Sequence, residues 1–565
     1  MKFFFKLIAI PVLAWAALSP NAARAQQTEA SGNDEFEVLK NLEIFSAVYK
    51  TAELAYVDGV EPGSLIKSAL DAMLRTLDPY TIYIPEAEIE DFRIMTEGEY
   101  GGIGSTIHAR AGWIYISDPY EGFPADQAGL KPGDKILEIN GESTQGKNVS
   151  DVSSLLKGQA GTSLTLLVES AGSAKPREVN LVRREIRIKN VTYSGMLRDS
   201  VGYIRQDGFT QGAMEEVRQA FLDLREKGMK YLVYDLRYNG GGLVDEAVGI
   251  VNLFLRKGVP VVSTKGKIKD RNHTYSTTKD PVDTEIPVVF LTSRGTASAS
   301  EILTGAMQDY DRAVLVGERT FGKGLVQNIL PLPYNAQMKV TVAKYYIPSG
   351  RCVQALDYSH KDENGRALPI PDSLRNAFRT AAGRVVYDGD GIEPDIEMEV
   401  PLLSAVAVSL VTKFLIFDYA NLYAAGHEKI GEIAKFEVTD ALYDDFLSFM
   451  KDKDYSYKLP SERILEQFKV EARNDSCFAE VETSFVQLAD KLAKTKEGDL
   501  TRNKEEIRSM LREEIVSRYY YQSGRAEAEL QGDRTVNRAI EVLLDKDLYR
   551  QLLSAGNSPK KNNHE

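Results

Sequence analysis

Three hydroxyl side chains, Thr296, Ser298 and Ser300, alternate with alanines at the start of the stretch "TASASEILTGAMQDY", which runs from Thr296 to Tyr310. It follows the apolar run "PVVFLTS", typical of a buried strand, and continues into a helical pattern in which Ile302 and Met307 fall on one side. Ser298 is therefore predicted at the first turn of a helix, where unpaired N–H groups and the helix dipole favour negative charge. A serine at such a junction is a candidate nucleophile beside a site for an oxyanion.

The same position is also typical of a helix N-cap, because serine is one of the residues preferred there. The local stretch does not separate a capping serine from a nucleophilic one, and both interpretations stay open at this point.

A nucleophilic serine needs a base, and the five scattered histidines and the lack of a G-x-S-x-G motif give little support to a histidine. A buried lysine is the other solution, since desolvation lowers the pKa of its amine. The stretch "GERTFGKGLVQNIL" supplies Lys323 between Gly322 and Gly324. Its second half is predicted to be extended, so that Lys323, Leu325 and Gln327 share one face and Gln327 hydrogen-bonds the amine.

The segment from Gly317 to Lys323 also matches seven positions of a phosphate-binding loop. Gly324 stands at the eighth position, where a Ser or Thr would bind Mg²⁺, and the following residues are predicted to be extended instead of helical. The sequence therefore disfavours a nucleotide site.

The elements around these residues fall into regions of different character. Residues 26–97 are predicted to be mainly helical, and residues 98–188 contain short β-patterned runs with one helix-like piece, "NVSDVSSLLKG". Strand and helix patterns alternate over residues 189–400, which predicts an α/β domain. Residues 401–557 return to a helical pattern, and residues 558–565 are expected to form a disordered tail.

The first 25 residues have basic residues, an apolar run and a final Ala-Arg-Ala, which together predict a cleaved signal peptide. We expect an exported protein, most simply in the periplasm and otherwise secreted. No integral membrane segment is expected after cleavage, because no later stretch reaches the ~20 apolar residues of a spanning helix.

Charge and cysteine content narrow the class of partner. Loss of Lys2, Lys6 and Arg24 with the signal changes the formal net charge from −13 to −16, which argues against nucleic acid or an anionic membrane as the main partner. Cys352 and Cys477 fit no zinc pattern, so no metal and no cofactor is implied, and the sequence leaves open whether the two are bridged.

The stretch "GTASASEILTGAMQDYDRAVLVGERTFGKGLVQ" resembles the signature of the carboxyl-terminal processing peptidases, or tail-specific proteases, which use a Ser/Lys dyad. The resemblance implies that Ser298 is the nucleophile, Lys323 the general base and Gln327 the residue that orients the lysine. The segment "LRYNGGG" is similar to the family's glycine segment, and implies that the amides of Gly241 and Ala299 form an oxyanion hole.

The resemblance extends from about residue 36 to residue 398, and it implies an α/β peptidase core of the ClpP/crotonase-like type. Thr296 and Gly240 replace a serine and a proline that are common in the family. The segment from Cys352 to Gly389 is longer than expected, which leaves access of the substrate open.

The small β domain resembles a PDZ domain in two stretches, "YGGIG" and "PADQAGLKPGDKILEINGE". In the first, the N–H groups of Gly101, Gly102, Ile103 and Gly104 are expected to bind a terminal carboxylate while a strand edge pairs with the peptide. A strand bulge or turn is the commoner interpretation of the glycines alone. The resemblance further implies that PDZ movement gates the active site and that an arginine at residue 183 or 184 takes part.

Together these features predict a multidomain α/β chain: an N-terminal helical region, a PDZ-like domain, a peptidase core and a C-terminal all-helical region. The leading hypothesis is an exported serine endopeptidase that recognises flexible protein C-termini through its PDZ domain and cleaves them. A non-catalytic PDZ scaffold or holdase is the alternative. The terminal helices are expected to build a homo-oligomer or to dock an adaptor protein.

Overall fold

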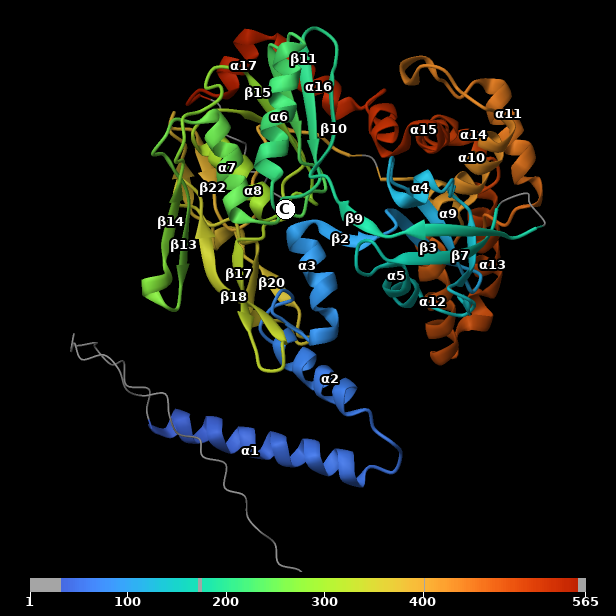
Figure 1. Ribbon diagram of the computed structural model, residues 1–565, viewed down its shortest axis with the longest axis horizontal. Coiled ribbons are helices and arrows are strands. Elements are labelled where there is room, and N and C mark those ends of the chain that lie inside the picture. The colour runs from blue at the N-terminus through green and yellow to red at the C-terminus, as the bar shows by residue number, and fades with distance from the viewer. Residues whose placement is uncertain (1–31, 171–174, 401, 557–565) are drawn as a thin grey trace, which may run out of the picture. The chain divides into compact units, whose positions relative to one another are not determined.

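The computed structural model describes residues 32–170, 175–400 and 402–556 (Figure 1). The predicted signal peptide and the predicted disordered tail lie outside the described residues. The chain divides into two compact units, residues 1–73 and residues 74–565. In the first unit, the predicted helical pattern forms α1 (Gly32–Ala55) and most of α2 (Pro62–Arg75), and the Tyr49 hydroxyl donates to the Pro62 carbonyl at 3.0 Å.

The second unit begins with short elements that lead into the PDZ domain predicted from the sequence. A six-stranded antiparallel sheet has the order β3-β4-β5-β7-β8, with β6 on β5, and β2 pairs with β9 beside it. Asn148 begins α5 with a capping box, as expected for "NVSDVSSLLKG". The elements are β1 (Ile82–Ile84), η1 (Glu86–Glu88), α3 (Ile89–Glu97), β2 (Glu99–Gly102), β3 (Ser105–Arg110), β4 (Trp113–Pro119), α4 (Pro124–Gln127), β5 (Lys135–Ile139), β6 (Glu142–Ser143), α5 (Val149–Leu156), β7 (Ser163–Glu169), β8 (Arg177–Val182) and β9 (Arg184–Arg187).

The peptidase core is built on a six-stranded sheet of order β10-β11-β12-β15-β16-β23. Neighbouring strands from β11 to β23 are parallel, and β10 is antiparallel to β11. The alternation of strand and helix patterns is confirmed here. The elements are β10 (Val191–Met196), β11 (Val201–Gln206), α6 (Ala213–Glu226), β12 (Tyr231–Asp235), α7 (Val244–Phe254), β15 (Val288–Thr292), α8 (Ala299–Asp309), β16 (Val314–Gly317) and β23 (Ile396–Glu397).

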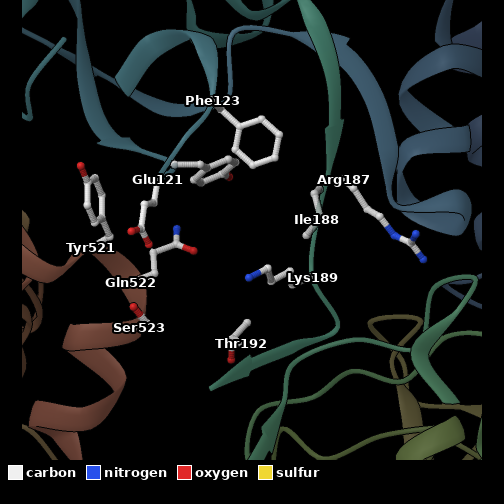
Figure 2. Close-up of a pocket in the computed structure, with 10 residues that line it drawn as sticks. Glu121, Phe123, Arg187, Ile188, Lys189, Thr192, Tyr521, Gln522 and Ser523 are labelled. Atoms are coloured by element: carbon white, nitrogen blue, oxygen red, sulfur yellow. The ribbon is translucent and has the colours of Figure 1, made fainter. Parts of the chain in front are cut away.

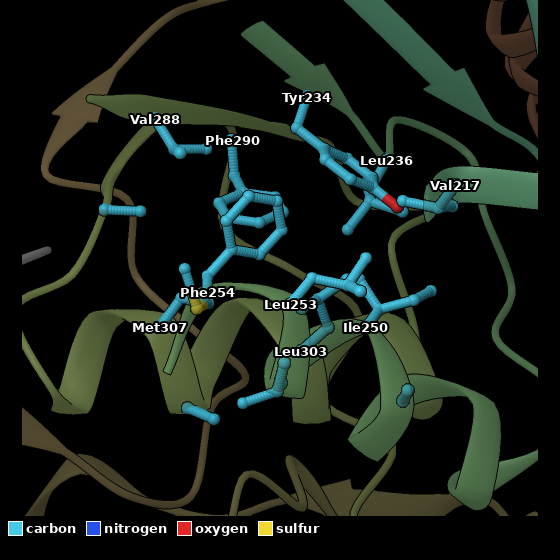
Figure 3. Packing of buried hydrophobic residues seen from close by; sticks show 14 of the residues in the cluster. Val217, Tyr234, Leu236, Ile250, Leu253, Phe254, Val288, Phe290, Leu303 and Met307 are labelled. Carbon is cyan, nitrogen blue, oxygen red and sulfur yellow. The ribbon is translucent and has the colours of Figure 1, made fainter. Parts of the chain in front are cut away.

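The core sheet is buried on both faces. In β15, Val288 and Phe290 pack with residues of α6, α7 and α8 (Figure 3), whereas Val289 and Leu291 pack with residues of α16 and α17 on the other face. A strand buried on both faces reads as a continuous apolar run, which is why the sequence pattern was clear. The helices α16 (Arg534–Leu544) and α17 (Lys546–Leu552), which the sequence groups with the C-terminal helical region, therefore complete the core.

A second, antiparallel sheet joins two strands that follow β16 to three earlier strands. Its order is β1-β18-β13-β14, with β17 on β18, and the long segment after Cys352 adds two small hairpins, β19-β20 and β21-β22. These elements are β13 (Pro260–Gly266), η2 (Lys269–Arg271), β14 (His273–Ser276), β17 (Leu325–Pro331), β18 (Gln337–Tyr346), β19 (Leu356–Lys361), β20 (Ala367–Pro369), η3 (Asp372–Leu374), β21 (Ala377–Arg379) and β22 (Val385–Tyr387).

The C-terminal helical region has its own apolar core, which includes Tyr419, Phe446 and Leu511. It also contacts the PDZ domain: the two terminal guanidinium nitrogens of Arg110 donate to the Asp418 carboxylate at 2.8 and 2.9 Å. Its elements are α9 (Ala405–Thr412), α10 (Leu415–Gly426), η4 (Ile433–Lys435), α11 (Asp440–Phe449), η5 (Met450–Asp452), α12 (Pro460–Asn474), α13 (Phe478–Thr495), α14 (Asp499–Arg502) and α15 (Lys504–Glu529).

In the part of the chain that the structure describes, no single helix is long and apolar enough to cross a membrane. The bent pair α9 and α10 meets that test only when the two helices are taken together. Cys352 and Cys477 carry free thiols.

Candidate active site

Three loops that carry the predicted site residues follow the carboxyl ends of parallel strands. Residues 236–242 follow β12, residues 293–298 follow β15, and residues 318–324 follow β16. Because β12, β15 and β16 are neighbours in the sheet, their carboxyl ends lie at one edge, which is where open α/β sheets place ligands.

Ser298 lies in a strained turn between β15 and α8. Its backbone has φ 58° and ψ −115°, the conformation of the first central residue of a type II′ turn, where glycine is usual. A non-glycine residue held in a sparsely populated region costs on the order of 1–3 kcal/mol, and such strain is concentrated at functional sites. The geometry is that of a strand-to-helix nucleophile turn, although the sequence lacks the G-x-S-x-G motif.

The turn is held by buried hydrogen bonds on both sides of the serine. The Thr296 hydroxyl accepts from the Ser293 N–H at 2.9 Å and donates to the Leu236 carbonyl at 2.8 Å, so the threonine that departs from the family pattern anchors the loop. The Tyr345 hydroxyl donates to the Ser298 carbonyl at 3.2 Å.

Ser298 does occupy the N-cap position that the alternative interpretation gave it. Among the described residues, however, its side chain makes no capping hydrogen bond, and the cap is closed instead by Glu301, whose carboxylate accepts from the Ser298 N–H at 2.8 Å. The Ser298 hydroxyl is therefore not used to cap the helix.

Glu301 connects the turn at Ser298 with residues 318–324, the loop that carries Lys323. It was not among the residues predicted from the sequence. The carboxylate is fully buried, and in addition to the Ser298 N–H it accepts from the N–H of Lys323 at 2.9 Å, the N–H of Gly322 at 2.7 Å and the Thr320 hydroxyl at 2.6 Å. Burial raises the pKa of Glu301, while these hydrogen bonds act in the opposite direction. The Ser-x-x-Glu spacing of a capping box was the available signal.

Lys323 lies partly buried just before β17, and its Nζ lies 4.3 Å from the centre of the Tyr80 ring. Burial, followed by the positive charge of Lys339, lowers the pKa of Lys323 to about 8, and Glu301 and Asp78 oppose the shift. In the described part of the chain, the amine forms no hydrogen bond with Ser298 or Gln327. The backbones of the predicted nucleophile and base are brought together, but their side chains are not joined.

Gln327 lies on β17, which confirms the extended segment expected after Lys323. Its amide donates to the Thr341 hydroxyl of β18 at 3.2 Å. The pairing of the two strands shifts register between Val326 and Gln327. The role of Gln327 in orienting the lysine stays a prediction.

The segments that carry the predicted oxyanion donors lie close together. Ala299 is the first residue of α8, so its N–H has no acceptor within the helix. Gly241 has φ 91°, and a Cβ there would lie 2.7 Å from the Ala299 nitrogen and 2.6 Å from the Ala297 oxygen, so only glycine fits. The Gly241 N–H donates to Asn239 Oδ1 at 2.9 Å, and it must exchange this bond before it can serve an oxyanion.

The loop predicted to bind a carboxylate lies beside a small cavity of the PDZ domain. β3 is the last strand of its sheet, so one of its edges is open to a peptide strand. A cavity of about 40 Å³ lies at this edge and is lined by Tyr100, Gly102, Ile103, Ser105, Ile107, Ser153, Leu156 and Lys157. A Cβ on Gly101 would lie 2.0 Å from the Gly158 oxygen, so Gly101 packs tightly behind the loop.

The two adjacent arginines have local contacts in the PDZ domain. The Arg183 guanidinium donates to the carbonyls of Leu155 and Leu156 at the end of α5, at 2.8 and 3.0 Å. Arg184 is exposed and lies 3.4 Å from the Gly122 carbonyl. Their participation in catalysis stays a prediction.

Two of the larger cavities in the described residues lie near the PDZ domain and near the loop that carries Lys323. One of about 210 Å³ lies between the PDZ domain, residues 187–192 and α15 (Figure 2), where the Tyr521 hydroxyl donates to Asp126 at 2.7 Å. The other, of about 600 Å³, adjoins the lysine loop at Thr320 and Phe321 and is also lined by Arg294, Arg375 and Tyr387.

Three stretches of the chain match known sequence families. Residues 200–358 match the family "Peptidase family S41", residues 115–170 match "PDZ domain", and residues 406–543 match "Probable PDZ-protease, C-terminal helical domain".

Individual proteins are also similar to the chain. A carboxy-terminal-processing protease of Bartonella bacilliformis is 34% identical over 328 residues, which cover 57% of this chain and 75% of that protein. A probable CtpA-like serine protease of Staphylococcus aureus is 34% identical over 316 residues, or 55% of this chain and 62% of that protein. The solved photosystem II D1 C-terminal processing protease is 26% identical, with a TM-score of 0.33 over 63% of this chain and 92% of the other.

Proposed function

The chain belongs to peptidase family S41 and is a carboxy-terminal-processing serine protease with a PDZ domain, and we propose that it cleaves exported proteins near flexible C-termini through an acyl-enzyme on Ser298. In this proposal Lys323 is the general base. The non-catalytic scaffold is not retained, because the family is one of peptidases.

One observation carries the assignment of the dyad. The buried Glu301 carboxylate accepts from the backbone N–H of Ser298 and of Lys323 at 2.8 and 2.9 Å, so one group fixes the segments of nucleophile and base together. A base must come within hydrogen-bond reach of the proton it takes, and such bonds often tighten only when substrate is bound. The remaining movement belongs to the lysine side chain.

The proposed reaction follows from these positions. The Ser298 oxygen attacks the carbonyl carbon of the scissile bond while its proton passes to the neutral Lys323 amine, which then protonates the leaving amine. Water hydrolyses the resulting ester. The Ala299 N–H, joined by that of Gly241 once its bond to Asn239 is exchanged, stabilises the charged oxygen of the intermediate.

Capture of the substrate is assigned to the PDZ domain. An extended C-terminus adds to the open edge of β3, its carboxylate reaches the N–H groups of residues 101–104, and its last side chain enters the cavity at Ile103, Ile107 and Leu156. Tethering the captured tail to the peptidase core raises its effective concentration at Ser298.

Export, most simply to the periplasm, is proposed on the basic and apolar pattern of the first 25 residues. Detection of the chain in a periplasmic fraction, with the N-terminus at Gln26, tests this part. A homo-oligomer or adaptor bound through the terminal helices is likewise a proposal, tested by light scattering of the purified chain.

The activity itself is tested with a folded protein that carries an unstructured C-terminal tail. The wild-type chain should cleave the tail, Ser298→Ala should be inactive, and Lys323→Arg should be inactive as well, because a guanidinium does not lose its proton at working pH. Proteolysis retained by a pure Ser298→Ala preparation would refute the assignment.

A further inference from the structure

Tyr80 lies in a rigid turn that precedes β1, more than 200 residues before Lys323 in the sequence. The buried Asp78 carboxylate forms this turn, because its Oδ1 accepts from the N–H groups of Tyr80 and Thr81, both at 2.8 Å. The Thr81 hydroxyl donates to the other carboxylate oxygen at 3.1 Å. The backbone that carries the Tyr80 ring is therefore fixed independently of the lysine.

A second aromatic ring supports the first from the long segment after Cys352. Tyr358 of β19 packs edge-to-face against Tyr80, with ring centres 6.2 Å apart. Burial, followed by a hydrogen bond to Tyr358, raises the pKa of Tyr80, so its phenol stays neutral. The long segment after Cys352 therefore contacts, through Tyr358, the Tyr80 ring that lies against Lys323.

The Lys323 amine lies over the face of this supported ring, 4.3 Å from its centre. The electron-rich face of an aromatic ring attracts a cation and has no comparable attraction for a neutral amine. Other charged groups that act on the amine are Lys339 on β18, Glu301 on α8 and Asp78 in the turn itself.

We propose that Tyr80 is a positioning residue for the general base, whose ring holds the protonated Lys323 amine away from Ser298 and releases the amine when it becomes neutral. This inference rests on the proposed function, since it assigns a partner to the base of that reaction. Protonation and position of the lysine are then coupled: the charged amine stays on the ring, and the neutral amine turns to the serine proton that it has to accept.

The coupling has a measurable consequence. A ring that stabilises only the protonated form raises the pKa of Lys323 relative to an apolar neighbour without a π face. Tyr80→Leu keeps the site apolar but removes the ring, so the pKa of Lys323 should fall by about 0.5 to 1.5 units. Tyr80→Phe keeps the ring and should leave the pKa within a few tenths of a unit.

The titration is measured without reference to activity. In chain labelled with ¹³C-lysine and carrying Ser298→Ala, the Cε signal of Lys323, assigned by its loss in Lys323→Arg, is followed with pH in the parent, Tyr80→Phe and Tyr80→Leu. Trp113→Leu is the matched control, because it removes a ring 4.4 Å from another amine, that of Lys135 in the PDZ domain. The control should leave the titration of Lys323 unchanged.

The inference is overturned if Tyr80→Leu leaves the pKa of Lys323 unchanged or raises it, or if Tyr80→Phe shifts it as far as Tyr80→Leu does. A second readout is the acid limb of kcat/KM in the Ser298 enzyme, which should move to lower pH in Tyr80→Leu and stay in place in Tyr80→Phe. A merely structural role for Tyr80 would lower kcat without moving that limb.

The two proposals fail separately. Proteolysis by Ser298→Ala contradicts the proposed function whatever the titration shows. An unshifted titration in a chain that needs both Ser298 and Lys323 contradicts only the role of Tyr80.

Discussion

The nucleophile and the base of the candidate site are held by the same carboxylate but in different ways. The Ser298 backbone is fixed on both sides of its strained turn, by Glu301 at its N–H and by Tyr345 at its carbonyl. The Lys323 backbone is fixed equally well, yet among the described residues its amine contacts a ring and is not hydrogen-bonded to the serine. The fold thus fixes the backbones of Ser298 and Lys323, and the Lys323 side chain has to move for its amine to reach the serine.

Holding Ser298 and holding Lys323 therefore have different energetic costs. The turn at Ser298 stores backbone strain that the buried hydrogen bonds of Glu301 have to offset. The lysine side carries an electrostatic cost instead, because burial and Lys339 disfavour its charged form. Variants that act on the shared backbone should therefore affect both residues, whereas a change of pH through about 8 should titrate the lysine.

Outside Ser298 and Lys323 themselves, the largest expected effect comes from Glu301→Gln. An amide must place an N–H among donors that now face carboxylate oxygens, and each buried donor left without an acceptor costs about 1–3 kcal/mol. We expect kcat to fall by about a hundredfold or more, together with a lower melting temperature.

Thr320→Val is the graded comparison for Glu301→Gln, because it removes one of the four donors to the carboxylate, together with the acceptor of the Ile392 N–H. It should give a smaller loss in both measurements. Wild-type activity in a stable Glu301→Gln chain would show that the carboxylate does not join the two halves of the site.

The pH dependence of kcat/KM should report the protonation of Lys323. The base acts in its neutral form, and its pKa is lowered to about 8, so kcat/KM should rise about tenfold per pH unit below that value and level off above it. The pH–rate profile of a peptide ester and of a tailed protein should share this limb. A profile that is flat between about pH 6 and pH 9 would contradict a lysine base with this pKa.

The smallest effect is expected in the PDZ domain, which lies outside the dyad. A Cβ on Gly101 would meet the Gly158 oxygen at 2.0 Å, so Gly101→Ala should displace the carboxylate loop. We expect KM for a tailed protein to rise about tenfold, while a short peptide ester that does not use the PDZ domain is hydrolysed normally.

Gly112→Asn is the matched control for Gly101→Ala. It changes a glycine in the turn between β3 and β4 where nothing lies within 4 Å of an added Cβ and where asparagine tolerates the positive φ of 76°. Equal effects of the two variants on KM would argue against a role of the loop in capturing tails.

Local patterns predicted the elements that carry the site but not the groups that join them. The runs that became β12, β15 and α8 were recognisable because the apolar residues of strands and helices recur with different periods. Ser298 and Lys323 were predicted from residue type, spacing and family resemblance. Glu301 was within reach of the same reasoning, since it stands at the capping-box spacing from Ser298.

Other features depend on contacts that no local pattern contains. Tyr80 meets Lys323 across more than 200 residues, and the Gly241 N–H is occupied by a side chain whose direction is set by the folded loop. The return of α16 and α17 to the core sheet is equally non-local, because their apolar faces read like those of the preceding helices. Residue type alone could not show which surface these helices cover.

Peptide mass mapping after reaction with a fluorophosphonate tests whether Lys323 assists acylation of the Ser298 alcohol. We expect one phosphonylated peptide, with the label on Ser298, and a labelling rate that rises with pH through about 8 and collapses in Lys323→Arg. A label on another residue, or equally fast labelling of Ser298 in Lys323→Arg, would contradict this expectation.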